Sequence, residues 1–262
     1  MKSCFVTAGW KFALPVILLV CARAAPAQDK KVSATHLQSE TPDWSGYYRL
    51  ARGKDLGDFK PVNTDLDKAI IPHLQSWAKA KMEATDGVAD DTGGVCLADG
   101  IFRYPPFAGS FIWLTSPNKI VLAFTEINTA GIRRIYLNRK HPKDVLPTWN
   151  GDSIGHWEGD TLVVDTTGFN DKSWLMSAME PHTEETHLTE RIRQVDNGQM
   201  IEIKSVVEDR HALTSAYTYT RYYNKNDAAM PAENVCNDEI AEWKEWRNKA
   251  LKKQYDRAHE VK

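Results

Sequence analysis

Residues 149–187 bring together side chains that can move protons and side chains that can bind an aromatic molecule. The stretch holds three tryptophans, three histidines and several carboxylates around one predicted strand hairpin, a density typical of a small-molecule pocket. His182 precedes a predicted strand, and a nearby carboxylate could orient the imidazole and keep its pKa near the working pH. We therefore predict His182 as a general acid or base, Glu184 or Glu185 as its orienting partner, and Asp171 as a second proton carrier.

An acid–base reaction also needs a group that stabilises the anion it forms. A strand over 186–195 places Arg191 on the same face as His187, so Arg191, or Arg133 from an earlier strand, is the predicted anion stabiliser. The residues predicted to line the binding pocket are Trp149, Trp157, Trp174, Phe169, Tyr136 and His156. The alternative is that the charged groups form solvated surface pairs and that the aromatic groups fill the core of the fold.

Two other motifs suggest different chemistry. Residues 151–155 match the G-x-S-x-G pattern of a nucleophile elbow, which requires a strand before Ser153 and a helix after it. A proline-containing run precedes this pattern and a hairpin follows it, so we interpret Ser153 as the start of a strand. His182 and His187 are five residues apart, which on a strand puts them on opposite faces. A metal would need a loop at 181–185 and a further ligand, so we predict no metal and no other cofactor.

The first 27 of the 262 residues are typical of a secretory signal peptide, with a basic start, an apolar centre and a small-residue cleavage site near Ala27. The apolar run is too short to cross a bilayer, and no later run is long enough to do so. Removal of this segment changes the net charge from −2 to −5, because it contains Lys2, Lys11 and Arg23 and no acid. A mildly acidic chain without a basic cluster argues against a nucleic-acid partner. We expect a periplasmic or secreted protein.

The rest of the chain indicates one domain over 43–262 that is mainly β, preceded by a flexible leader at 28–42. Strand patterns separated by turn residues are predicted at 43–48, 110–114, 120–127, 132–137, 153–157, 161–167, 186–195, 200–208 and 217–223. Short turns favour an antiparallel up-and-down meander that closes into a lipocalin-like barrel, with a two-sheet sandwich as the alternative. One helix is predicted at 70–84 and a second at the C-terminus, 238–259.

Cys96 and Cys236 are the two cysteines that remain after the signal segment. In an exported protein such a pair predicts a disulfide, and two free thiols are the alternative. The bridge would connect the C-terminal arm to the front of the core.

The run WNGDSIGHWEGDTLVVDTTGFNDKSWL, followed by PHTEETHLTER, resembles the signature of a large, mostly uncharacterised family of exported bacterial proteins. The likeness spans roughly residues 96–225 and extends loosely to the aromatic segment at 44–48 and to both cysteines. It implies export and a β-rich, calycin-like barrel, and it carries no particular reaction. The positions that belong to the family pattern are Asp152, His156, Glu158, Asp171, His182, Glu184 and Arg191. The N-terminal third, including the segment around Trp77, departs from that pattern.

Taken together, these features predict a cofactor-free acid–base enzyme, of the lyase or isomerase type, acting on a hydrophobic, aromatic small molecule. Elimination, retro-aldol cleavage and isomerisation all fit the residues. A periplasmic carrier that binds the same molecule without chemistry is the main alternative, and a metal-dependent hydrolase is the third. The sequence makes no prediction of the oligomeric state.

Overall fold

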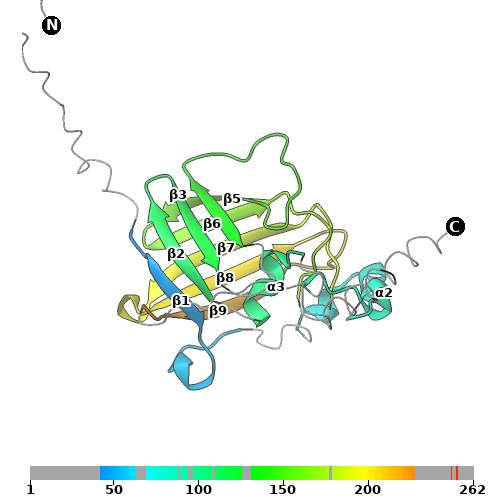
Figure 1. Cartoon of the computed structure of the whole chain (residues 1–262), viewed down its shortest axis with the longest axis horizontal. Helices are drawn as coiled ribbons and strands as arrows, with labels where there is room; N and C mark the ends of the chain where they lie inside the picture. The colour runs from blue at the N-terminus through cyan, green and yellow to red at the C-terminus, as the bar shows by residue number, and fades with distance from the viewer. Residues whose placement is uncertain are drawn as a thin grey trace, which may run out of the picture. The chain divides into compact units, whose positions relative to one another are not determined.

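The computed structural model describes residues 42–62, 69–87, 89–93, 97–107, 110–125, 131–176 and 179–227, together with Lys249 and Lys252. Nine strands form one closed barrel, each paired with the next in the chain and the last paired with the first (Figure 1). The strands are β1 Gly46–Leu50, β2 Ser110–Ser116, β3 Lys119–Phe124, β4 Ile132–Leu137, β5 Asp152–Glu158, β6 Thr161–Thr167, β7 His187–Val195, β8 Met200–Glu208 and β9 Tyr217–Lys225. The predicted barrel is thus confirmed, and the two-sheet sandwich is wrong.

The expectation of a fully antiparallel meander is wrong at one place. β4 and β5 pair in parallel, with Ile135 opposite Ser153 and Leu137 opposite Gly155. The connection at 138–151 causes this, because it carries the chain back along the barrel before β5 begins, where a tight turn would have reversed its direction. Figure 1 shows this connection as a long loop between the two strands.

The two predicted hairpins form as expected. The β5–β6 turn has Gly159 at φ 63°, and the β7–β8 turn places Asp196, Asn197 and Gly198 at φ 50°, 52° and 82°. This left-handed backbone is easy for glycine and tolerable for Asn and Asp, which explains the strength of the Asn-Gly signal.

Side chains alternate between the inside and the outside of the barrel. On β4, Arg133, Ile135 and Leu137 are buried, whereas their neighbours Arg134 and Tyr136 are more exposed. One apolar cluster fills the barrel with large groups, among which Trp113, Tyr48 and Phe111 are almost fully buried. The interior is therefore a packed core over most of its length.

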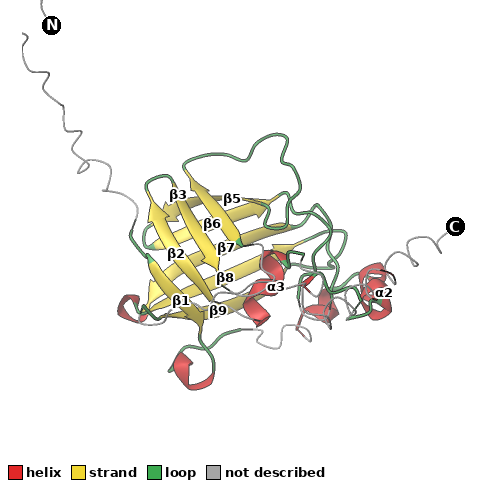
Figure 2. Cartoon of the chain, in the orientation of Figure 1, coloured by secondary structure: helices red, strands yellow, loops and turns green. Residues whose placement is uncertain are grey.

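Both α-helices lie on the right-hand side of the view in Figure 2, whereas two short 3-10 turns, Gly53–Leu56 and Asp196–Gly198, lie at other edges of the barrel. The helix predicted at 70–84 is interrupted: a 3-10 turn, Ile71–His73, precedes the α-helix α2, Ser76–Ala84, with Leu74 and Gln75 extended between them. The break comes from pairing with a distant segment: Leu74 forms a β-bridge with Leu213, and Gln75 N donates a hydrogen bond to the carbonyl of Ala212 at 2.8 Å. A second α-helix, α3 at Gly100–Phe107, was not predicted, because Pro105 and Pro106 obscure its pattern.

Both helices contribute to a second apolar cluster. Ala78 of α2 and Phe102 of α3 pack there with Val207, Tyr217 and Phe169. The predicted signal peptide, the leader up to residue 41, both cysteines and nearly all of the predicted C-terminal helix lie outside the described residues. Among the helices that are described, none has the length and apolar character needed to cross a membrane.

Candidate functional site

His182 is buried inside the protein, with 2% of its surface exposed. Its Nδ1 lies 3.1 Å from the carbonyl oxygen of Thr183 and 3.0 Å from Oγ1 of Thr186, and its Nε2 lies 2.9 Å from Oγ of Ser173. A carbonyl only accepts hydrogen bonds, so Nδ1 carries the hydrogen and Nε2 accepts one from Ser173. Burial lowers the pKa of His182 to about 4. The predicted role of general acid or base is therefore not supported, because the ring is neutral, enclosed and fully bonded.

The predicted partners of His182 point elsewhere. Glu184 and Asp171 are exposed, and neither forms a hydrogen bond with the ring among the contacts of the described residues. Glu185 forms ion pairs with Arg210, at 2.6 Å, and with His211, at 3.3 Å. A turn at residues 184 and 185 directs these carboxylates outward, which corrects the prediction that one of them orients the imidazole.

Arg191 and His156 lie on the outer surface of the barrel. Arg191 is 50% exposed and pairs with Glu158 at 2.8 Å, and His156 is 63% exposed and lies 3.2 Å from the same carboxylate. These residues form the solvated pair of the alternative interpretation. Neither the predicted anion-stabilising role of Arg191 nor the predicted substrate contact of His156 fits this position.

Arg133 points into the barrel, as its predicted role requires. It forms a buried ion pair with Glu190, and it donates hydrogen bonds to Ser153 Oγ at 3.2 Å and to Thr166 Oγ1 at 3.0 Å. The described interior cavity that Arg133 lines measures about 30 Å³. That volume holds two or three water-sized groups and no aromatic molecule. Ser153 is 1% exposed and bonded to Arg133, so it is not an exposed nucleophile.

The predicted aromatic residues divide between the core and the surface. Trp157 packs edge-on against Trp44 at 4.9 Å between ring centroids, and Phe169 packs against Phe102 at 4.6 Å. Trp149, Trp174 and Tyr136 line surface pockets. The six predicted pocket residues therefore do not surround one shared cavity.

Two surface pockets meet at Trp149. One, of about 370 Å³, lies over the parallel pair β4–β5 and is lined by Arg134, Tyr136, Trp149 and Asp152 among others. The other, of about 500 Å³, is lined by Trp149, Trp174, Lys81 and Lys172 among others. Both volumes fall within the range of about 300–1,000 Å³ that is usual for small-molecule sites. The first of the two is called the Trp149 pocket below.

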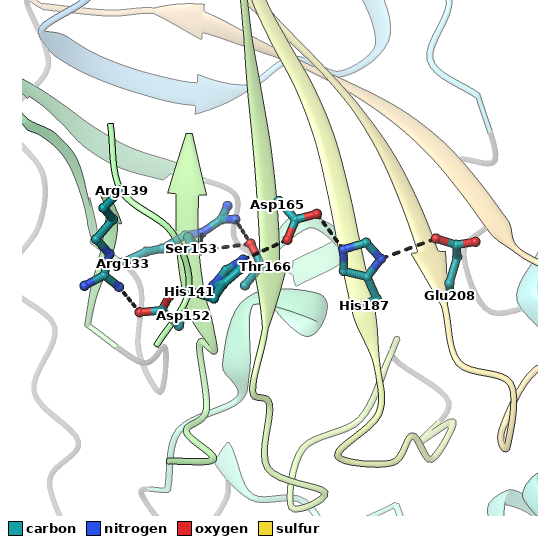
Figure 3. A network of polar contacts seen from close by, with 9 residues as sticks. All are labelled: Arg133, Arg139, His141, Asp152, Ser153, Asp165, Thr166, His187 and Glu208. Carbon is teal, nitrogen blue, oxygen red and sulfur yellow. Dashed lines mark hydrogen bonds and ion pairs between the residues drawn. The ribbon is translucent and has the colours of Figure 1, made fainter. Parts of the chain in front are cut away.

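A polar network begins at the wall of the Trp149 pocket and crosses the outside of the barrel (Figure 3). Asp152 forms an ion pair with Arg139, and its Oδ1 lies 2.7 Å from Nδ1 of His141. The other ring nitrogen of His141 lies 2.8 Å from Oδ1 of Asp165. Each nitrogen of His141 thus faces a carboxylate oxygen, so the ring bridges Asp152 and Asp165.

The network continues beyond Asp165. Oδ2 of Asp165 lies 2.7 Å from Nε2 of His187, and Nδ1 of His187 lies 3.4 Å from Glu208. Burial opposes ionisation of Asp165, but the hydrogen bonds from His141 and His187 outweigh it and lower the pKa of Asp165. Asp165 is therefore a fixed anion between two imidazoles.

Strand geometry explains how the network is held. Asp165 and Thr166 are neighbours on β6, so one faces outward to His141 and the other faces inward to Arg133 (Figure 3). The 138–151 connection supplies His141, and two backbone hydrogen bonds fix its far end. Thr148 N donates to the carbonyl of Gly168 at 3.0 Å, and Asn170 N donates to the carbonyl of Thr148 at 2.9 Å.

Sequence reasoning missed His141 and Asp165 as site residues. The proline-containing run before residues 151–155, which spans residues 141–147, served only as an argument against a nucleophile elbow. The available signal was the outward register of β6 and β7, which puts Asp165 and His187 on the same face. Within the described ranges, no group of three or more His, Cys, Asp or Glu side chains is arranged to hold a metal ion.

A scan against models of known protein families finds no match to this chain. A search of curated proteins also finds no similar sequence. The resemblance to the family of exported proteins therefore remains a prediction, and the function has to be argued from the pocket and the network.

Proposed function

We propose that this protein is an exported acid–base enzyme that acts on an aromatic small molecule bound in the Trp149 pocket. The observation that carries the proposal is the position of Asp152. It forms part of the pocket wall and is also held by His141, which is held in turn by Asp165. A carboxylate at a pocket of this size, fixed by oriented partners, is the arrangement that general base catalysis requires.

In this proposal Asp152 takes a proton from a carbon atom of the substrate and returns it to another atom. The transfer gives an isomerisation when the second atom belongs to the same molecule, and an elimination when it belongs to a leaving group. Each oxygen of Asp152 has one described partner, and a carboxylate oxygen can accept two hydrogen bonds, so lone pairs remain for the substrate. Arg134 on the same wall replaces Arg133 and Arg191 as the group that stabilises the anion.

Tyr136 and Trp149 provide the aromatic surface for binding. The guanidinium of Arg139 stacks on Tyr136, with its central carbon 3.8 Å from the ring centroid. Arg139 also pairs with Asp152, so it joins the binding surface to the base. The interior cavity beside Arg133, at about 30 Å³, is too small for an aromatic molecule, which supports this outer location.

The test is incubation in D₂O with a panel of aromatic aldehydes, ketones and hydroxyketones, followed by mass spectrometry. The wild-type protein should produce a rearranged or cleaved product, or incorporate deuterium into one class of compound. D152N should reduce the rate at least about 100-fold, because a general base contributes about 10²–10⁴-fold. E158Q is the matched control, because Glu158 lies on the same strand outside the pocket.

Unchanged turnover in D152N would remove Asp152 from the mechanism. Binding of an aromatic compound without any chemical change or deuterium uptake would favour the carrier alternative. The second pocket, with Trp174, Lys81 and Lys172, provides an aromatic and basic surface on which a carrier could hold an anionic aromatic ligand.

His141 is a positioning residue in this proposal, because it lies behind Asp152 and is not on the pocket wall. H141Q should lower kcat more than it raises KM and should change the pH dependence of kcat. A purely structural role for His141 would lower the stability without changing the pH profile of the remaining activity. The comparison therefore separates positioning from folding.

A further inference from the structure

The inside of the barrel contains a small polar chamber that the proposed reaction does not use. It measures about 30 Å³. Its polar lining consists of Arg133, Glu190, Ser205, Tyr219, Arg221 and Tyr223. Apolar side chains, including Ile101 of α3, complete the wall.

The chamber contains a buried hydroxyl whose hydrogen-bonding capacity is not fully used. The hydroxyl of Ser205, a residue that is 1% exposed, has no partner at normal hydrogen-bond distance in the described ranges and interacts more weakly with the phenol of Tyr219. Arg133 uses Nε and Nη2 for its hydrogen bonds to Ser153, Thr166 and Glu190. Buried donors of this kind are normally satisfied by a bound group or by water.

The two phenols are donors as well. Burial raises the pKa of Tyr219 to about 12 and also raises the pKa of Tyr223, so both rings keep their hydroxyl hydrogen at neutral pH. The carboxylate of the chamber, Glu190, is already bound to Arg133. The lining thus sets two guanidinium groups, Arg133 and Arg221, and three hydroxyl groups against a single carboxylate, which favours an oxyanion as the bound group.

We propose that this chamber is a binding site for a small carboxylate of one or two carbon atoms, held by Arg133, Ser205 and the two tyrosines. The volume sets the size limit, because two or three water-sized groups correspond to formate and approach acetate. The donors favour a negatively charged ligand, because the two oxygens of a carboxylate can accept hydrogen bonds from the guanidinium and from the hydroxyls at the same time.

The test is a titration with ¹³C-labelled formate followed by NMR, together with the melting temperature in formate and in chloride at equal ionic strength. Wild-type protein should bind formate saturably and melt at a higher temperature in formate than in chloride. The affinity should fall along the series formate, acetate, propionate, benzoate. Equal melting temperatures in the two salts, or benzoate binding as tight as formate, would overturn the proposal.

Conservative variants locate the site. S205A and Y223F each remove one donor and add no volume, and each should weaken formate binding about tenfold or more, because hydrogen bonds to charged groups are among the strongest. Y47F is the matched control, because Tyr47 is the neighbour of buried Tyr48 on β1 and faces outward. Formate binding that is unchanged in S205A and Y223F would overturn the proposal.

The chamber and the Trp149 pocket are tested independently. D152N changes the outer face of the barrel and should retain full formate binding. If D152N loses turnover and S205A retains formate binding, the proposed function stands and the chamber proposal fails. If D152N retains turnover and S205A loses formate binding, the chamber proposal stands and the proposed function fails.

Discussion

Both ring nitrogens of His182 bond within the 173–186 segment, one to Ser173 and the other to Thr183 and Thr186. Thr186, which contacts one nitrogen, also donates a hydrogen bond to Asp209 at 2.8 Å, and Thr183 N donates to the same carboxylate at 2.7 Å. Burial acts against the charge of Asp209, but these hydrogen bonds outweigh it and lower the pKa of Asp209. The residue with the strongest catalytic signal in the sequence therefore organises the fold.

This role predicts a pH dependence of stability. The pKa of His182 is about 4 in the folded protein and about 6.5 in the unfolded chain, so below pH 6.5 the unfolded state binds a proton that the folded state does not. The contribution to stability is complete above pH 6.5 and is lost as the pH falls towards 4. The loss is on the order of 3 kcal/mol. Urea unfolding between pH 4 and 7 measures it.

Asp99 acts in the opposite direction in the same range. Burial is the largest effect on this carboxyl and raises its pKa to about 6, so the folded state holds a proton that the unfolded state has released, and stability falls as the pH rises from 4 to 6. Variants are needed to separate the two. H182Q should remove the loss of stability on acidification, and D99N should make it steeper. The same pH slope in H182Q and the wild type would contradict the assignment.

The neighbours of His182 in the sequence misled the prediction for a physical reason. Glu184 and Glu185 are close along the chain, but a turn directs them into solvent, and the carboxylate that organises the segment, Asp209, comes from the connection after β8. Which residues from distant parts of a chain come into contact depends on the fold, and the spacing of neighbouring residues gives no information about such contacts.

At the scale of elements, the Trp149 pocket depends on how the 138–151 connection meets the end of β6. Gly168 has φ 71°, and a β-carbon at this position would overlap the side chain of Val145. The carbonyl of Gly168 accepts the hydrogen bond from Thr148 N. Glycine at 168 thus permits the close approach that places Trp149 beside Asp152.

G168A should lower the stability by about 1–3 kcal/mol and displace the connection, because it adds both overpacking and left-handed strain. Hydrogen exchange should show loss of protection at the amides of Thr148 and Asn170. G159A is the matched control, because Gly159 has a similar φ of 63° and a β-carbon added there would meet no atom within 4 Å. Equal effects of the two variants would mean that strain alone matters.

The strands were predictable and the helices less so. A run of β-branched and aromatic residues bounded by turn residues is a local property, and it located β4, β6 and β8 with their observed bounds. α3 is eight residues long and contains two adjacent prolines, so it has little local helix signal, and its Phe102 packs in a cluster with Phe169 and Val207. Elements determined by tertiary contacts escape a prediction based on periodicity.

At the scale of the whole molecule, the ion pair of Arg133 and Glu190 ties β4 to β7 across the interior. Removing one partner leaves a buried charge without compensation, so R133M or E190Q alone should cost about 3–5 kcal/mol. The double variant should cost clearly less than the sum of the two. Urea unfolding of the four proteins measures the coupling, and additive losses would show that the two groups do not stabilise each other.

The barrel was predictable from the sequence, but its filled interior was not. Strand number and turn length favour closure, whereas the free volume depends on how Trp113, Tyr48 and Phe111 pack against one another. The sequence therefore showed that aromatic residues are abundant, but the prediction assigned to a ligand pocket several that pack in the core. The prediction was right that Trp149 and Tyr136 line a pocket. Tyr136 lies on the outward face of β4, and Trp149 lines the same pocket from the 138–151 connection.

The odd number of strands has a consequence for where new chemistry can arise. A ring in which every neighbour runs in the opposite direction must have an even number of members, so a ring of nine requires a pair that runs the same way. That pair needs a connection as long as the barrel wall, and such a segment is free to carry side chains that no hairpin could present. Arg139, His141 and Trp149 all belong to this connection, so the odd number of strands makes necessary the segment that carries the site.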